Sequence, residues 1–270
     1  KKCNKMLWYK GKPFIKILDE FQTKKNLLSN HIRFPVQDIY KVGDKRVIVG
    51  KIESGRISQG TELLFLPSNE KARVKTLEIW PNADKEYFKG DSIGFTLDEP
   101  IFVDKGNLAS DLKTPPKLMN RFEANVFWLS EEKINFKKKY TMKINTGVYE
   151  VFINKVKNVL NTDNLELKTN TTVSKNDVCE LVIHSSHLIP MDDYFFFKIT
   201  ARFCLLDDMQ IVAGGIIDLK NYPDQREKIF NLGNNVIPEN YNINEIDRAI
   251  KFNHRPGIIW LTGLSGAGKS

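Results

Sequence analysis

The final eight residues of the sequence form a glycine-rich loop whose residue types suit the binding of phosphate groups. They are Gly263, Leu264, Ser265, Gly266, Ala267, Gly268, Lys269 and Ser270. This segment matches G-x-x-x-x-G-K-[ST] at every fixed position. The glycines let successive backbone N–H groups point at phosphate oxygens. Lys269 adds a mobile positive charge, and the hydroxyl of Ser270 is a ligand for Mg²⁺. The sequence therefore predicts a loop for the phosphates of ATP.

A loop of this kind lies between a buried strand and a helix whose positive end faces the same anion. Residues 258–261, Ile-Ile-Trp-Leu, form a short apolar run that suits the strand. The sequence stops at Ser270, so the helix is not part of it. We therefore expect residues 257–270 to be the truncated start of an α/β domain. We expect them to bind ATP weakly or not at all without the rest of that domain.

Two histidines lie close together at His184 and His187, with Cys179 nearby. A metal site needs further ligands at suitable spacing, and the sequence offers none close by. We therefore interpret both histidines as strand-end or turn residues. We find no nucleophile elbow and no Cys/His pair with catalytic spacing, so we predict no catalytic residue in these 270 residues.

Three other groups of side chains could carry chemistry, but each has a simpler explanation. Trp8, Trp80 and Trp128 could stack on bases, although packing in a barrel core or an interface is the favoured interpretation. Residues 207–208, Asp-Asp, could act as paired carboxylates but are typical of a solvated hairpin tip. Residues 137–139 form the only run of lysines, and such short runs usually face water.

The first half of the chain predicts a helix followed by short strands. Pro13 and the spacing of the apolar residues indicate a helix over residues 12–22, with Pro13 in its first turn. The expected strands are 36–42, 46–54, 61–67, 72–80 and 92–97. Gly43 and Asp44 are a hairpin signal between the first two strands. Evenly spaced strands without helices favour a closed or nearly closed β-barrel.

A second β-rich region follows a stiff linker at residues 111–116, which contain Thr-Pro-Pro. The expected strands are 119–129, 140–144, 148–160, 178–184, 194–204 and 210–217, with a hairpin tip at 161–164. Residues 218–241 read as a loose linker, and residues 244–252 as a short helix. The predicted fold class is mainly β, with two barrels in tandem.

Charge, cysteine content and the first residues indicate which partners and which cellular compartment to expect. The formal net charge is +8, but lysines and acids alternate along most of the chain, so we expect no nucleic-acid partner. The sequence has no stretch of about 18 apolar residues, so we expect no membrane partner either. Cys3, Cys179 and Cys204 are odd in number and far apart, which favours a reducing cytoplasm over a disulfide framework. The sequence starts with Lys-Lys-Cys, so we expect it to begin inside a longer protein.

Residues 4–21 resemble the end of the GTPase domain in elongation-factor-1A-like proteins, where a Trp-Tyr-x-Gly element leads into the final helix. Residues 33–110 resemble the second domain of these proteins, and residues 117–217 more loosely resemble the third. The matching segments of the second domain are Arg33 to Tyr40, Val49 to Arg56 and Gly90 to Leu97. The resemblance implies translation-factor-type barrels at 31–112 and 117–217, after a 1–30 segment that ends the GTPase domain.

Two sets of segments indicate which branch of this superfamily the sequence resembles most. Gln37 to Tyr40, taken with Arg73 to Trp80, is most similar to the large, GTP-binding subunit of bacterial sulfate adenylyltransferase. Asn253 to Pro256, followed by Ile259 to Ser270, resembles the start of adenylylsulfate kinase. The two together imply a GTPase subunit fused to a kinase, joined by a linker at 218–256.

The resemblance implies an enzyme that makes adenylyl sulfate from ATP and sulfate with GTP hydrolysis, and then phosphorylates its 3′-hydroxyl. Its partners would be a small catalytic subunit and the chain's own GTPase and kinase domains. The GTPase motifs are absent from these 270 residues, so we expect this part to bind no GTP and to be inactive alone. One alternative is a translation-factor-type module that contacts aminoacyl-tRNA. Another is a structural module beside an unrelated P-loop kinase.

Overall fold

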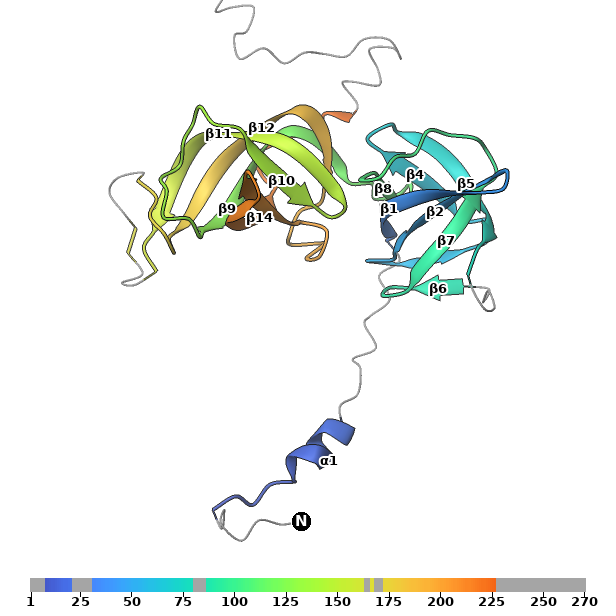
Figure 1. Cartoon of the computed structure of the whole chain (residues 1–270), viewed down its shortest axis with the longest axis horizontal. Helices are drawn as coiled ribbons and strands as arrows, with labels where there is room; N and C mark the ends of the chain where they lie inside the picture. The colour runs from blue at the N-terminus through green and yellow to red at the C-terminus, as the bar shows by residue number, and fades with distance from the viewer. Residues whose placement is uncertain (1–7, 21–30, 80–85, 163–165, 168–171, 227–270) are drawn as a thin grey trace, which may run out of the picture. The chain divides into compact units, whose positions relative to one another are not determined.

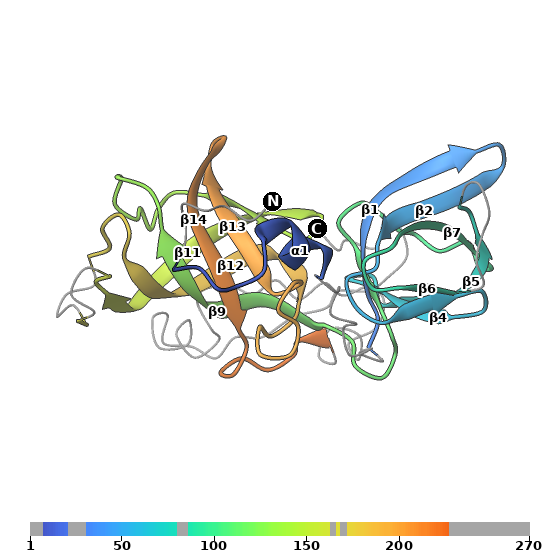
Figure 2. The ribbon, with the colours of Figure 1, turned by 90° about the horizontal axis from the view of Figure 1, so that it is seen from below.

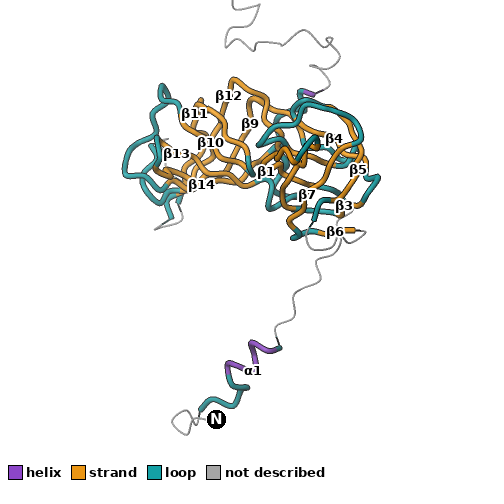
Figure 3. Tube along the Cα trace, turned by 45° about the vertical axis from the view of Figure 1, so that its right-hand side comes forward, coloured by secondary structure: helices purple, strands orange, loops and turns teal. Residues whose placement is uncertain are grey.

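The computed structural model describes residues 8–20, 31–79, 86–162, 166–167 and 172–226 (Figure 1). All of these lie in one compact unit, Lys1–Arg226. Strands dominate the described chain (Figure 3). No helix among these residues is long and apolar enough to cross a membrane. The mainly β fold with two barrels confirms the predicted fold class of the described region.

The N-terminal helix is shorter than predicted. Helix α1 spans Phe14–Asp19, and Pro13 is its N-cap rather than a residue of its first turn. Pro13 has an extended ψ of 145°, so helical geometry starts only at the next residue. The backbone carbonyl of Pro13 still accepts hydrogen bonds from the N–H groups of Lys16 and Ile17. The Pro13 carbonyl therefore closes the first turn.

The first barrel contains six antiparallel strands in the order β1-β2-β7-β5-β4-β8. They are β1 (Arg33–Val42), β2 (Lys45–Lys51), β4 (Glu62–Leu66), β5 (Glu70–Leu77), β7 (Ser92–Leu97) and β8 (Leu108–Ser110). Two further strands, β3 (Arg56–Ser58) and β6 (Glu86–Phe88), pair with each other. Strands β3, β6 and β8 were not predicted, because three residues are too few to show a period.

Alternating side chains explain why these segments close into a barrel. In β5, Ala72 and Val74 point into the core while Arg73 and Lys75 face solvent. Phe34 and Phe95 are fully buried, with ring centroids 5.0 Å apart. The predicted hairpin between β1 and β2 is confirmed, since Gly43 has the positive φ of 60° that such a turn needs.

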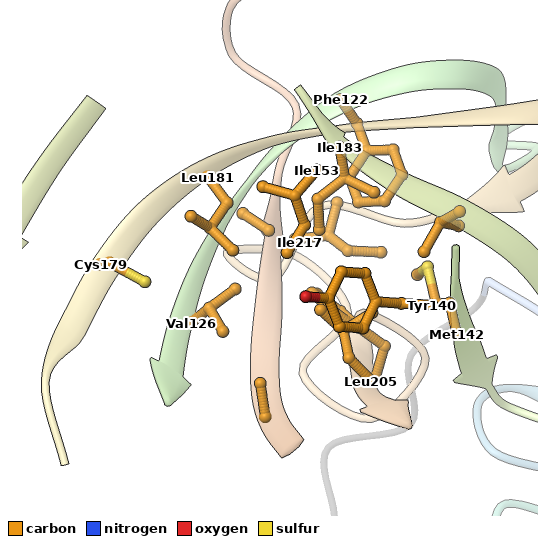
Figure 4. Packing of buried hydrophobic residues seen from close by; sticks show 14 of the residues in the cluster. Phe122, Val126, Tyr140, Met142, Ile153, Cys179, Leu181, Ile183, Leu205 and Ile217 are labelled. Atoms are coloured by element: carbon orange, nitrogen blue, oxygen red, sulfur yellow. The ribbon is translucent and has the colours of Figure 1, made fainter. Parts of the chain in front are cut away.

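The second barrel also has six antiparallel strands, in the order β10-β11-β12-β9-β14-β13. Figure 2 labels β9, β11, β12, β13 and β14 of this barrel. They are β9 (Lys117–Trp128), β10 (Tyr140–Ile144), β11 (Gly147–Leu160), β12 (Val178–Met191), β13 (Arg202–Asp207) and β14 (Gln210–Asp218). Figure 4 shows how Phe122 of β9, Leu181 and Ile183 of β12, and Ile217 of β14 converge in the core. Apolar burial of this kind supplies the main driving force for closing the barrel.

Two strand predictions in this barrel were wrong. Strand β12 runs on to Met191 instead of ending at His184. The register of its pairing with β9 shifts between His184 and Ile189, and the pairing resumes after this irregularity. Residues 194–201 are turns, and β13 begins only at Arg202. The carboxylate of Asp193 accepts the backbone N–H of Phe195 at 2.9 Å, so an Asx turn replaces the expected strand.

The connector between the barrels is held by one carboxylate, Asp111. Its oxygens accept the backbone N–H groups of Ile32 at 3.0 Å, Lys113 at 3.0 Å and Thr114 at 2.9 Å. The side-chain hydroxyl of Thr114 donates to the same carboxylate at 3.1 Å. The predicted linker is therefore fixed by hydrogen bonds as well as by its prolines.

We predict that Asp111→Ala lowers the free energy of unfolding by about 1–3 kcal/mol, because three backbone donors lose their acceptor. Asp98→Ala is the matched control, since the exposed carboxylate of Asp98 accepts the N–H of Arg73 at 2.8 Å. Urea unfolding followed by circular dichroism measures both variants. Equal losses in the two variants would contradict a special role for the Asp111 carboxylate.

Candidate functional site

The predicted phosphate loop, Gly263 to Ser270, lies outside the described residues, as does Trp80. The same holds for the short apolar strand at 258–261 and for the expected helix at 244–252. The roles of Lys269 with ATP and of Ser270 with Mg²⁺ therefore stay predictions. The candidate site that the structure describes is built from residues 31–226.

The two histidines are not placed alike. His184 is half-buried in β12, whereas His187 is exposed and its Nδ1 lies 3.1 Å from the hydroxyl of Ser186. Burial lowers the pKa of His184, and the nearby charge of Arg121 lowers it further. Burial raises the pKa of the Cys179 thiol to about 12. Within the described residues, no group of three or more His, Cys, Asp and Glu side chains could hold a metal ion.

The lowered pKa of His184 predicts a pH dependence of stability. Because the folded pKa lies below the unfolded value of about 6.5, the unfolded chain takes up the proton first as the pH falls. The free energy of unfolding should therefore drop between about pH 7 and pH 5. His184→Gln should flatten this dependence, because the variant has no imidazole to take up the proton. Melting temperatures at pH 7.5 and 5.5 measure it, with the exposed His187→Gln as control; an unchanged slope in His184→Gln would contradict the assignment.

The paired carboxylates lie where the sequence placed them but are not both solvated. Asp207 ends β13 and Asp208 sits at the hairpin tip with a positive φ of 51°. The Asp207 side chain is largely buried and forms an ion pair of 2.6 Å with Lys138. This hydrogen bond and charge raise the pKa of Lys138. The lysine run faces water, which confirms the prediction: Lys137 is exposed, and the side chain of Lys139, which pairs with Glu150 at 3.1 Å, is 61% exposed.

The two described tryptophans differ in burial. Trp128 is buried in the second barrel, and its indole N–H donates to the carbonyl of Glu132 at 2.9 Å. Packing in the barrel core, rather than stacking on bases, is therefore its role. Trp8 is exposed next to Tyr9, with ring centroids 6.0 Å apart. The exposed fraction of Trp8 is 75%.

The feature that sequence reasoning missed is a buried ion pair between the barrels. Arg33, at the start of β1, is only 1% exposed. Its guanidinium donates three hydrogen bonds of 2.8 to 3.0 Å to the carboxylate of Asp192, directly after β12. The hydroxyl of Thr200 donates to the same carboxylate at 2.5 Å. Forked pairing of this kind fixes direction as well as charge.

Further contacts complete the surroundings of the Arg33 guanidinium. One nitrogen donates to the carbonyl of Ile32 at 2.8 Å, and the carboxylate of Asp111 lies 3.7 Å away. The guanidinium carbon lies 3.9 Å from the ring centre of Phe197, a cation–π geometry. Arg33 thereby joins the first barrel, the connector and the second barrel.

The segment that supplies Phe197 also presents apolar side chains to solvent. We call residues 192–201, between β12 and β13, the aromatic loop. Its Phe195 is 79% exposed and its Phe196 is 74% exposed. A cavity of about 590 Å³ lies beside the loop, lined by Phe196, Phe197, Lys117 and Lys220 among others. The described residues therefore combine a rigid joint with a hollowed apolar surface, an arrangement suited to binding and positioning.

Comparisons with known proteins agree with this arrangement of barrels. The family description "GTP-eEF1A C-terminal domain-like" matches residues 121–218. The bifunctional enzyme NodQ of Rhizobium tropici is 25% identical over the whole chain, which spans 42% of that protein. Sulfate adenylyltransferase subunit 1 of Bacteroides fragilis is 26% identical over 93% of the chain and 54% of that protein. These proteins are homologues of the chain.

The homologues are longer than the chain, which spans about half of their length or less. Elongation factor 1-alpha of Thermoplasma acidophilum is 28% identical over 80% of the chain and 52% of its own length. Among solved structures, Sup35 complexed with GDP matches with a TM-score of 0.66 at 21% identity. That match covers 78% of this chain and 52% of the Sup35 chain. At this identity the structural match shows a shared translation-factor-type fold.

Proposed function

We propose that the chain is the barrel part of a bifunctional sulfate-activation enzyme. Such an enzyme forms adenylyl sulfate from ATP and sulfate with GTP hydrolysis, and then phosphorylates its 3′-hydroxyl with a second ATP. The observation that carries the proposal is the match to NodQ, a protein named as bifunctional, over 100% of the chain. Matches to sulfate adenylyltransferase subunit 1 of Shewanella woodyi and Alteromonas mediterranea cover 80%.

The longer NodQ match supports a second activity beyond the barrels. In this proposal, Gly263 to Ser270 hold the phosphates of ATP, with Lys269 beside the outer phosphates. The hydroxyl of Ser270 holds Mg²⁺ there. The donor types fit the group, because backbone N–H groups, an ammonium and a hydroxyl are what a nucleotide triphosphate with its magnesium requires.

The barrels have a supporting role in this proposal. The buried Arg33–Asp192 pair holds one barrel against the other, and the aromatic loop supplies an apolar surface. The name of the homologues, sulfate adenylyltransferase subunit 1, supports a second, catalytic subunit as partner. GTP would bind to a GTPase domain of the same protein. A cytoplasmic location suits the described cysteines Cys179 and Cys204, which are both free.

The direct test uses the full-length protein mixed with its second subunit, ATP and sulfate, with and without GTP. We expect adenylyl sulfate to form, and its rate to rise when GTP is present. Chromatography of the nucleotides measures the product. The control omits the second subunit, which should leave ATP unconverted. Failure to form adenylyl sulfate in the complete mixture would contradict the proposed first activity.

A second candidate function is binding of aminoacyl-tRNA, favoured by the 28% identity to elongation factor 1-alpha. A phosphate loop at the end of the barrels has no place in such a module. The salt dependence of tRNA binding distinguishes the two candidate functions, because the affinity for nucleic-acid phosphates falls steeply as the salt concentration rises. The sulfate proposal expects weak tRNA binding at 150 mM salt; tight binding there would favour the tRNA-binding module.

A further inference from the structure

The aromatic loop holds its exposed apolar side chains in a fixed geometry. Phe195 and Phe196 pack edge to face, with ring centroids 5.1 Å apart. The backbone N–H of Phe197 donates to the carbonyl of Asp193 at 3.0 Å, and that of Ala201 donates to the carbonyl of Phe197 at 3.2 Å. The loop is therefore preformed, and docking on it would cost little ordering entropy.

Both carboxylates of the aromatic loop already have partners within the chain. Asp192 is buried and paired with Arg33. The two carboxylate oxygens of Asp193 accept the backbone N–H groups of Phe195 at 2.9 Å and Leu219 at 3.0 Å. Neither carboxylate points freely outward, so both are poorly placed to attract a cationic ligand.

The rim of the cavity carries positive charge. Lys117 and Lys220 line the cavity of about 590 Å³. Lys198 and Lys89 outnumber the one acid, Glu53, in a neighbouring cavity of about 250 Å³, which also has Phe196 as a wall. Within the described residues, no ion pair is formed by Lys89, Lys117 or Lys198, while Lys220 pairs only with Asp218 at 3.4 Å. An apolar centre with a basic rim matches a partner of the opposite pattern.

We propose that the aromatic loop and the cavity beside it dock the second subunit of the adenylyltransferase. The docking segment of that subunit carries an apolar side chain flanked by carboxylates. The apolar side chain fills the cavity beside Phe196, and the carboxylates meet Lys117 and Lys198. This inference rests on the proposed function and deepens it by placing the partner on one surface.

The lining of the cavity favours a protein segment over nucleic acid. Met191, Phe197 and Leu219 line it, and such an apolar interior suits an apolar side chain better than a charged phosphate backbone. The edge-to-face arrangement of Phe195 and Phe196 also leaves no single flat platform for a run of bases. Fixed exposed aromatic residues of this kind are common anchors of protein interfaces.

The test measures the affinity of the full-length protein for the purified second subunit by titration calorimetry. Phe196→Ser should weaken binding at least tenfold, because a buried aromatic anchor is lost. Phe102→Ser is the matched control, since Phe102 is 76% exposed in the first barrel and should leave the affinity within twofold. Lys198→Glu should weaken binding severalfold at low salt, and less at high salt. Melting temperatures of all variants confirm that they are folded.

The outcomes separate the inference from the proposed function. If the wild-type pair makes adenylyl sulfate but Phe196→Ser binds as tightly as wild type, the docking surface is wrong and the function stands. If the wild-type mixture makes no adenylyl sulfate, the proposed function itself is wrong. A Phe196→Ser variant that loses tRNA binding while keeping subunit binding would also overturn the docking surface.

Discussion

Lys269→Ala in the full-length protein should abolish the phosphorylation of adenylyl sulfate, with a loss of about 100-fold or more in rate. In the proposed loop, the Lys269 ammonium sits beside the phosphates, where charge shifts during phosphoryl transfer. Alanine removes this positive charge, and the backbone N–H groups alone cannot replace it. The measurement is the formation of phosphoadenylyl sulfate from adenylyl sulfate and ATP.

The same protein supplies two controls for this prediction. Lys139→Ala removes an exposed lysine on the second barrel and should leave the phosphorylation rate unchanged. The formation of adenylyl sulfate should also persist in Lys269→Ala, because that step uses another part of the protein. An unchanged phosphorylation rate in Lys269→Ala would remove the proposed role of the loop.

Asp192→Ala should be the most destabilising substitution at the joint between the barrels, lowering the free energy of unfolding by about 3–5 kcal/mol. The cost is large because the variant leaves the Arg33 guanidinium buried without its forked counter-ion. Asp111, at 3.7 Å, compensates only in part. Urea unfolding of the chain measures the loss.

An exposed ion pair provides the comparison. Glu86 pairs with Arg56 at 3.4 Å, with side chains 66% exposed for Arg56 and 43% for Glu86. Glu86→Ala should cost under about 1 kcal/mol. The double variant Arg33→Met with Asp192→Leu should recover part of the loss, because no unpaired charge remains. If Asp192→Ala were no worse than Glu86→Ala, the Arg33–Asp192 pair would not be what joins the barrels.

Local signals predicted much of the fold. Gly43 marked the β1–β2 hairpin because its positive φ is needed there, and Asp207 with Asp208 marked the β13–β14 tip. Strands β7 and β10 were predicted to the residue, because turn residues bound both of them and apolar side chains fill them. Hairpin turns and short strands of this kind depend on a few neighbouring residues, so they can be predicted from the sequence.

Features made by distant residues could not be predicted in this way. Arg33 and Asp192 are separated by 159 positions, and nothing near either one indicates the other. The same is true of Glu123, in β9. Burial would raise its pKa, but the hydrogen bonds from Lys157 and Asn221 lower it overall. Ion-pair and hydrogen-bond partners that are distant in sequence are brought together only by the folded barrels, so they cannot be predicted from local sequence.

The aromatic loop is a partial exception. The run Tyr194-Phe195-Phe196-Phe197 was read as a strand because aromatic residues are frequent in strands. The two acids before it, Asp192 and Asp193, were the signal for a turn. Two consecutive acids before an aromatic run therefore indicate a turn and an exposed loop.

The most direct test of the account follows labelled sulfate in the presence of the full-length protein, its second subunit, ATP and GTP. The label should pass first into adenylyl sulfate and then into phosphoadenylyl sulfate. Sulfate that stays unconverted, in a mixture where the same protein binds aminoacyl-tRNA tightly at 150 mM salt, would contradict it.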